Sequence, residues 1–126
     1  MKTLFASIAA LSLAVPAAAQ DKPMTLEQTM LLRCSAAFAI IANEQERGVA
    51  TTKRDYPDLR TRGKEYFVRA SARLMDELEL SREQISAKLR DQVEALQKGS
   101  VEAPNPKAYV DGVMQPCLIA LDASGL

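Results

Sequence analysis

The sequence predicts an all-α protein, a small bundle of four helices in which one disulfide joins the first helix to the last. Apolar residues recur every three or four positions in four blocks, and no block alternates as a half-buried strand would. Two cysteines, Cys34 and Cys117, stand in the first and last blocks. We expect the helices at about 26–47, 57–79, 82–98 and 106–122.

The N-terminus has the pattern of a bacterial export signal. Lys2 supplies positive charge, an apolar run follows from Leu4 to Val15, and Ala17–Ala19 offers small side chains for cleavage. The run is shorter than the roughly 20 apolar residues of a membrane span. We therefore expect residues 1–19 to be a cleaved signal peptide. Residues 20–126 are expected to form a single periplasmic domain without a transmembrane anchor.

The first helix is expected to begin after Thr25 and to end at Gly48. Gln28 lies three residues after Thr25, which is the spacing of a capping box. Glycine is common just beyond a helix C-terminus. The inward-facing residues of this helix are expected to be Leu26, Met30, Cys34, Ala37, Phe38 and Ile41.

The two cysteines are expected to pair. Disulfides are typical of an oxidising compartment such as the periplasm, although two separate buried thiols are the alternative. In the loop-entropy estimate, a bond between Cys34 and Cys117 stabilises the fold by roughly 4 to 5 kcal/mol. Pro116 directly precedes Cys117, and a proline inside a helix favours a bend that would direct the sulfur toward Cys34. We expect a structural bond, since redox-active pairs usually have C-x-x-C spacing.

The second helix is expected to follow a polar connection over residues 49–55 and to be the longest. Pro57 fits the first turn of a helix. Gly63 within it indicates either that another backbone passes close by or that the helix begins near Lys64, and we favour close packing.

The third helix has the clearest start signal in the chain. Ser81 and Gln84 form a capping box, and Leu80 is placed to pack on Ile85. Gly99 is expected to end this helix. Because almost no loop separates it from the second helix, we expect a sharp corner or an antiparallel hairpin there.

The chemistry that the chain can perform is limited by its composition. It has no histidine, which excludes Ser-His and Cys-His nucleophile pairs and histidine metal sites. No glycine-rich phosphate loop occurs among its five glycines. Its 16 basic and 16 acidic residues balance, which gives no sign of nucleic-acid binding. We expect no catalytic residues, no metal and no cofactor.

Acidic residues form two groups that are candidates for carboxylate chemistry. Paired carboxylates can act as acid and base in sugar hydrolysis. The simpler interpretation of the second group is a charged helix end beside the positive start of the third helix. The groups are Glu44 with Glu46, and Asp76 with Glu77 and Glu79.

A basic flank is the candidate site for an anionic partner. Arg62, Arg69 and Arg73 fall along one flank of the second helix near Tyr66. Arginines in this arrangement bind lipid head groups or acidic protein surfaces. The simpler interpretation is a solvated face on which Arg73 and Glu77 form an i,i+4 ion pair.

Residues 33–48, 66–77 and 121–126 read RCSAAFAIIANEQERG, YFVRASARLMDE and LDASGL. These segments resemble a recurring class of small exported helical proteins of alphaproteobacteria, a resemblance that implies no particular activity. In plan the chain is also similar to the periplasmic acid-stress chaperones, since both combine a signal peptide, helices and one long-range disulfide. This second likeness includes no shared motif.

The leading functional expectation is a non-catalytic periplasmic binding or interaction protein, with an unknown envelope protein or lipid as partner. An apolar groove left open between the helices would favour it. The first alternative is an acid-activated periplasmic chaperone that loosens when its carboxylates are protonated, at about pH 4. The second alternative is a small cell-envelope enzyme that uses carboxylates.

Overall fold

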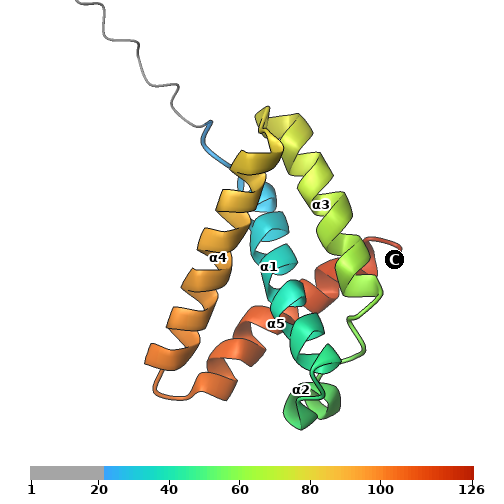
Figure 1. Ribbon diagram of the computed structural model, residues 1–126, viewed down its shortest axis with the longest axis vertical. Helices are drawn as coiled ribbons and strands as arrows, with labels where there is room; N and C mark the ends of the chain where they lie inside the picture. Colours follow the sequence, from blue (N-terminus) through green and yellow to red (C-terminus); the bar gives the residue numbers. More distant parts are fainter. Residues whose placement is uncertain (1–21) are drawn as a thin grey trace, which may run out of the picture.

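The computed structural model describes residues 22–126, so the predicted signal peptide, residues 1–19, lies outside the described residues. Within that range the chain forms α-helices and no β-strand, which confirms the all-α prediction (Figure 1). The helices are α1 (Leu26–Glu46), α2 (Ala50–Asp55), α3 (Arg62–Leu78), α4 (Arg82–Glu102) and α5 (Pro106–Ala123).

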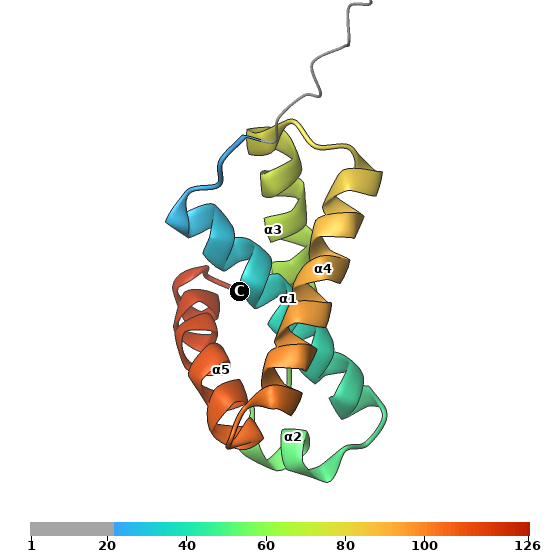
Figure 2. The same ribbon diagram turned by 90° about the vertical axis from the view of Figure 1, so that its left-hand side faces the viewer.

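The central helix of the bundle is α1, which contacts each of the other four helices. α3 and α4 diverge from the corner that joins them at the top of Figure 1, and α1 packs against both. α5 crosses α1 farther down, and α2 lies at the lower end of the molecule beside the last turns of α1 (Figure 2). Only residues 79–81 separate α3 from α4, so the connection is as short as the sequence predicts.

Both predicted capping boxes are present. The Gln28 backbone N–H donates to Thr25 Oγ1 at 3.2 Å, and the Thr25 N–H donates to Gln28 Oε1 at 3.0 Å. Ser81 and Gln84 exchange the equivalent bonds at 3.1 and 2.8 Å. These local signals fix the starts of α1 and α4 where the sequence predicts them.

The predicted end and inward face of α1 are confirmed except at its first residue. Gly48 has a φ of +80°, the left-handed conformation that terminates a helix. Leu26, however, is 81% exposed and does not belong to the inward face. Met24, just before the cap, packs against the apolar cluster at this end of the bundle instead.

The helix predicted at 57–79 begins later, at Arg62. Pro57 and Leu59 lie in a non-helical segment that Gln45 of α1 holds in place. The Gln45 Nε2 donates to the Pro57 carbonyl at 2.8 Å, and its Oε1 accepts from the Leu59 N–H at 2.9 Å. The Leu59 side chain is 1% exposed, so the segment is anchored in the core rather than free to join the helix.

The close packing expected at Gly63 is confirmed. A Cβ atom at this position would lie 3.0 Å from the Leu59 Cβ and 3.3 Å from the Phe38 Cβ. A side chain at residue 63 would require Leu59 and Phe38 to shift by a few tenths of an ångström, so glycine suits the close approach of α3 to α1.

The connection predicted over residues 49–55 contains the short helix α2. Its anchor is Thr52, which is buried. The Thr52 hydroxyl donates to the Val49 carbonyl at 3.0 Å, and the Thr52 carbonyl accepts from Gln45 Nε2 at 3.3 Å. Tertiary contacts thus impose a helix on a polar stretch that has no apolar periodicity of its own.

The third predicted helix runs farther than residue 98, because Gly99 does not end it. α4 continues to Glu102, and it stops where Pro104 disfavours helical backbone at Ala103, which has a ψ of 142°. The prediction that the second helix is the longest was also wrong. α1 and α4 each have 21 residues, whereas α3 has 17.

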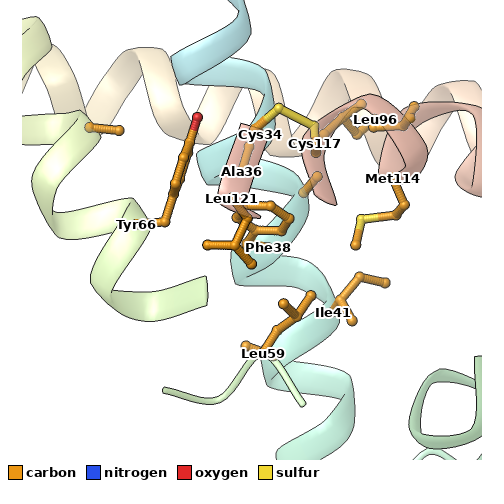
Figure 3. Close-up of a cluster of buried hydrophobic side chains, with 14 residues drawn as sticks. Cys34, Ala36, Phe38, Ile41, Leu59, Tyr66, Leu96, Met114, Cys117 and Leu121 are labelled. Atoms are coloured by element: carbon orange, nitrogen blue, oxygen red, sulfur yellow. A yellow bond between two sulfur atoms is a disulfide. The ribbon is translucent and has the colours of Figure 1, made fainter. Parts of the chain in front are cut away.

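The predicted disulfide between Cys34 and Cys117 joins α1 to α5 across the main core (Figure 3). Both cysteines are fully buried, and their Cα atoms are 5.2 Å apart. Phe38 lies in the same cluster and meets Tyr66 of α3 edge-to-face, with ring centroids 5.1 Å apart. Pro116 lies inside α5, directly before the bonded cysteine.

A second apolar cluster fills the corner between α1, α3 and α4. Leu80 packs against this cluster, as its predicted contact with Ile85 requires. The buried members of the cluster are Leu32, Leu74, Leu78, Ile85 and Leu89.

Candidate functional site

The predicted basic flank does not form one binding surface. The Arg62 Nε donates to the Leu126 carbonyl at 2.7 Å, so this arginine holds the C-terminus. Arg69 pairs with Glu65 of its own helix at 2.8 Å. Tyr66 points into the core, is 6% exposed, and has its pKa raised by burial.

The third arginine of the flank connects two helices. The Arg73 Nε donates to Glu77 at 2.6 Å, which is the predicted i,i+4 pair, and its Nη1 donates to Glu27 of α1 at 2.9 Å. The guanidinium groups of the flank are therefore directed to three separate places, and each is engaged by the protein itself.

The two predicted acidic groups lie at opposite ends of the α1–α3 pair. Glu46 pairs with Lys64 near the start of α3, whereas Glu77 accepts from Gln28 near the start of α1. This separation prevents the two groups from acting together on one substrate. Within residues 22–126, moreover, no three Cys, Asp or Glu side chains are grouped as metal ligands.

A pocket of about 600 Å³ lies between α1, α2, α4 and α5. Figure 2 shows how the four helices that contribute its lining residues are arranged. Residues three or four apart on α1 supply one wall, and the first turns of α5 supply the wall opposite. The aliphatic lining consists of Ala37, Ile40, Ile41, Leu96, Val101, Val110, Val113 and Met114.

The wall formed by α2 is held by a hydrogen-bonded cluster. The Tyr56 hydroxyl donates to Asp111 Oδ1 at 2.5 Å, and the Lys107 ammonium donates to Asp111 Oδ2 at 2.6 Å. The Lys107 and Tyr56 bonds hold the pKa of Asp111 below its usual value. Burial raises the pKa of Tyr56, and its bond to Asp111 raises it further. The end of α2 is thus tied to α5.

The same cluster borders a second, smaller hollow of about 310 Å³. Both hollows are lined by Asp55, Tyr56, Lys107 and Met114, so these residues stand between them. The pocket therefore has a polar border on the side where α2 meets α5. Elsewhere its lining is mostly aliphatic, with Glu44 of α1 and Gln97 and Ser100 of α4 as polar members.

The wall between α4 and α5 depends on the contact of Gly99 with Tyr109. A Cβ atom at residue 99 would lie 2.2 Å from the Tyr109 hydroxyl oxygen. Tyr109 also lines the pocket. Gly99, which the sequence predicts as a helix end, is instead the point at which Tyr109 of the pocket wall packs on α4.

The charged residues at the pocket are paired with one exception. Arg54 pairs with Asp55 at 3.0 Å, and Lys107 pairs with Asp111 at 2.6 Å. Glu44 of α1 lines the pocket, is half-buried, and forms no ion pair with any other residue in the described part of the chain.

No protein-family model, curated protein or solved structure matches this chain. None of the helices in residues 22–126 has the length and hydropathy needed to cross a membrane.

The pocket could not be located from the sequence alone. One signal was present, because Ile40 stands beside Ala37 and Ile41 of the predicted inward stripe and widens the apolar face of α1. A helix needs such a wide face when it packs on one side and lines a hollow on the other. The position of α2, which completes the pocket, follows from contacts with Gln45 that the sequence does not indicate.

Proposed function

We propose that this protein is an exported, non-catalytic binding protein that holds an apolar ligand in the pocket between α1, α2, α4 and α5. The observation that carries the proposal is a pocket of about 600 Å³ with an aliphatic lining and a polar border. Small-molecule sites in proteins commonly enclose about 300–1,000 Å³ and combine an apolar lining with a few polar groups.

The pocket walls are fixed before any ligand arrives. The disulfide joins α1 to α5, Gln45 holds the segment after α2, and Tyr56 ties that segment to Asp111. In a preformed site, less of the binding free energy is lost to ordering the protein. Val101 at the pocket is 82% exposed, which leaves apolar surface available to a ligand.

The proposed compartment is the periplasm. Three features support it: the signal-like N-terminus, the buried disulfide, and the absence of a spanning helix in residues 22–126. Detection of the chain in the periplasmic fraction, with its N-terminus near residue 20, is the expected result. A cytoplasmic chain that keeps Met1 would contradict export.

Binding is tested with the neutral fluorescent probe N-phenyl-1-naphthylamine and the chain from residue 20. We expect saturable binding at one probe per protein. Val110→Trp fills the pocket and should abolish binding, since Val110 lines it. Val68→Trp is the matched control, because Val68 lies on α3 outside the pocket and is 64% exposed. Equal binding by both variants, or no binding by the wild type, would overturn the proposal.

A second candidate function, an acid-activated chaperone, is supported by the ion pairs between α1 and α3. Glu27 pairs with Arg73 and Glu46 pairs with Lys64, so carboxylates on α1 contribute to holding α3. Protonation below about pH 4 removes these pairs while the disulfide still restrains the chain. The test is suppression of client aggregation at pH 3, compared with pH 7. Equal suppression at both values would remove this candidate.

The third candidate, an enzyme that uses carboxylates, gains no support from the arrangement of the acidic groups. Glu46 and Glu77 pair at opposite ends of α1 and α3. Glu44 lines the pocket without a second carboxylate of the predicted groups beside it.

A further inference from the structure

We infer that the pocket selects a cationic amphiphile, a small molecule with an aliphatic body and one positively charged nitrogen, and that Glu44 binds the charge. This inference rests on the proposed function and adds the chemical class of the ligand. Its basis is the balance of charges around the pocket together with the position of Glu44.

The charges that line the two hollows leave one carboxylate unmatched. Arg54 is held by Asp55, and Lys107 is held by Asp111. The Arg54 side chain is 69% exposed, so it is directed largely to solvent. Glu44 is left without a counterion among residues 22–126, and the site lacks one positive charge.

Glu44 lies where an amphiphile would place its head group. It follows Ile40 and Ile41 by one helical turn, so its side chain lies on the same face of α1 as the aliphatic wall. An aliphatic chain lying along that wall brings its end group to the carboxylate. Tyr56 and Asp55 of the polar border line the same pocket as Glu44.

Desolvation determines which head group the site accepts. A ligand that fills the pocket displaces water from the half-buried Glu44. Removing a carboxylate from water is unfavourable unless a positive charge or hydrogen-bond donors replace the water. A cationic head group supplies both, a neutral one supplies less, and an anionic one adds repulsion. Complementarity of charge therefore favours the cation.

The volume of the site favours a small molecule over a protein segment. The volume of about 600 Å³ lies within the range of small-molecule pockets, about 300–1,000 Å³. An amphipathic helix would instead need an elongated apolar groove with anchors along several turns.

The experiment compares alkyl chains of equal length and different charge as competitors of N-phenyl-1-naphthylamine. The competitors are decyltrimethylammonium, decylamine, decanol and decanoate at pH 7, each below its micelle concentration. For the wild type we expect either cation to displace the probe at concentrations at least tenfold lower than decanoate. Glu44→Gln should reduce this preference about tenfold, equivalent to about 1.4 kcal/mol.

Glu94→Gln is the matched control, because Glu94 is an exposed residue of α4 that does not line the pocket. It makes the same change in net charge and should keep the wild-type preference. If the probe binds but the charge preference is absent, or survives in Glu44→Gln, the inference is overturned and the proposed function stands. If the probe does not bind at all, both fail. Displacement by a basic amphipathic peptide but by neither cation would also overturn the inference, in favour of a protein partner.

Discussion

The side-chain amide of Gln45 accepts a hydrogen bond from the backbone N–H of Leu59 at 2.9 Å. Both residues are buried, at 3% and 1% exposure. This contact fixes the segment between α2 and α3 against α1, and with it one wall of the pocket. A single polar side chain thus connects the core to the proposed binding site.

Replacing Gln45 is expected to destabilise the protein and open the pocket wall. Gln45→Ala leaves the buried Leu59 N–H and the Pro57 carbonyl without their partner. Unsatisfied buried groups cost about 1–3 kcal/mol each. Urea unfolding should show a loss of at least 2 kcal/mol, and hydrogen exchange should accelerate over residues 52–59. Asn43→Ala, at an exposed position of the same helix, is the control. Equal losses in the two variants would contradict this role.

Removing the disulfide is expected to lower stability without changing the fold. Cys34 and Cys117 are separated by 83 residues, and a bond across a loop of that length contributes up to roughly 5 kcal/mol. Urea unfolding of the Cys34→Ala/Cys117→Ala variant measures the loss. The circular dichroism spectrum should remain helical at low urea. An unchanged free energy of unfolding would show that the bond does not stabilise the bundle.

The effect of Gly99→Ala on the free energy of unfolding is expected to change sign when the residue at position 109 is changed. In the wild type the added methyl group clashes with the Tyr109 ring, so the substitution should destabilise. With Tyr109→Ala in the background, the same substitution should stabilise by about 1 kcal/mol, because alanine favours the helix interior over glycine. A double-mutant cycle by chemical denaturation measures the difference. The same sign in both backgrounds would contradict the close contact.

Stability is expected to decrease as the pH falls through the acidic range. The hydrogen bond from Gln28 and the ion pair with Arg73 hold the pKa of Glu77 below its usual value, and Lys22 does the same for the pKa of Glu79. A pKa that is lower in the folded state gives stability that is present above the unfolded pKa and is lost as pH falls through the folded pKa. Unfolding measured from about pH 6 to pH 3 should be less pH-dependent in Glu77→Gln than in the exposed control Glu94→Gln. Identical profiles would exclude a contribution from Glu77.

The features that the sequence predicted correctly are those set by neighbouring residues. Thr25 with Gln28 and Ser81 with Gln84 specify helix starts within one turn, and Arg73 meets Glu77 on one helix face. The disulfide was also predictable, because the chain has only two cysteines to pair.

The features that the sequence did not reveal depend on distant contacts. Nothing near Gln45 indicates that its amide will hold Leu59, and nothing near Gly99 indicates that Tyr109 will pack on it. The sequence predicted Arg62 in a surface site. Its true partner, the Leu126 carbonyl, lies 64 residues away in the chain, so no local pattern indicates the bond. The pocket requires the placement of Tyr109 and of α2, so it became visible only in the folded structure.

The most direct test of the proposed function is a methyl NMR titration of the chain from residue 20 with N-phenyl-1-naphthylamine. We expect shift changes at the pocket methyl groups of Ile40, Val110 and Met114. The methyl groups of Val68 and Ile119, which are exposed outside the pocket, should remain unchanged. Shift changes at Val68 or Ile119 with none at the pocket residues would contradict the account.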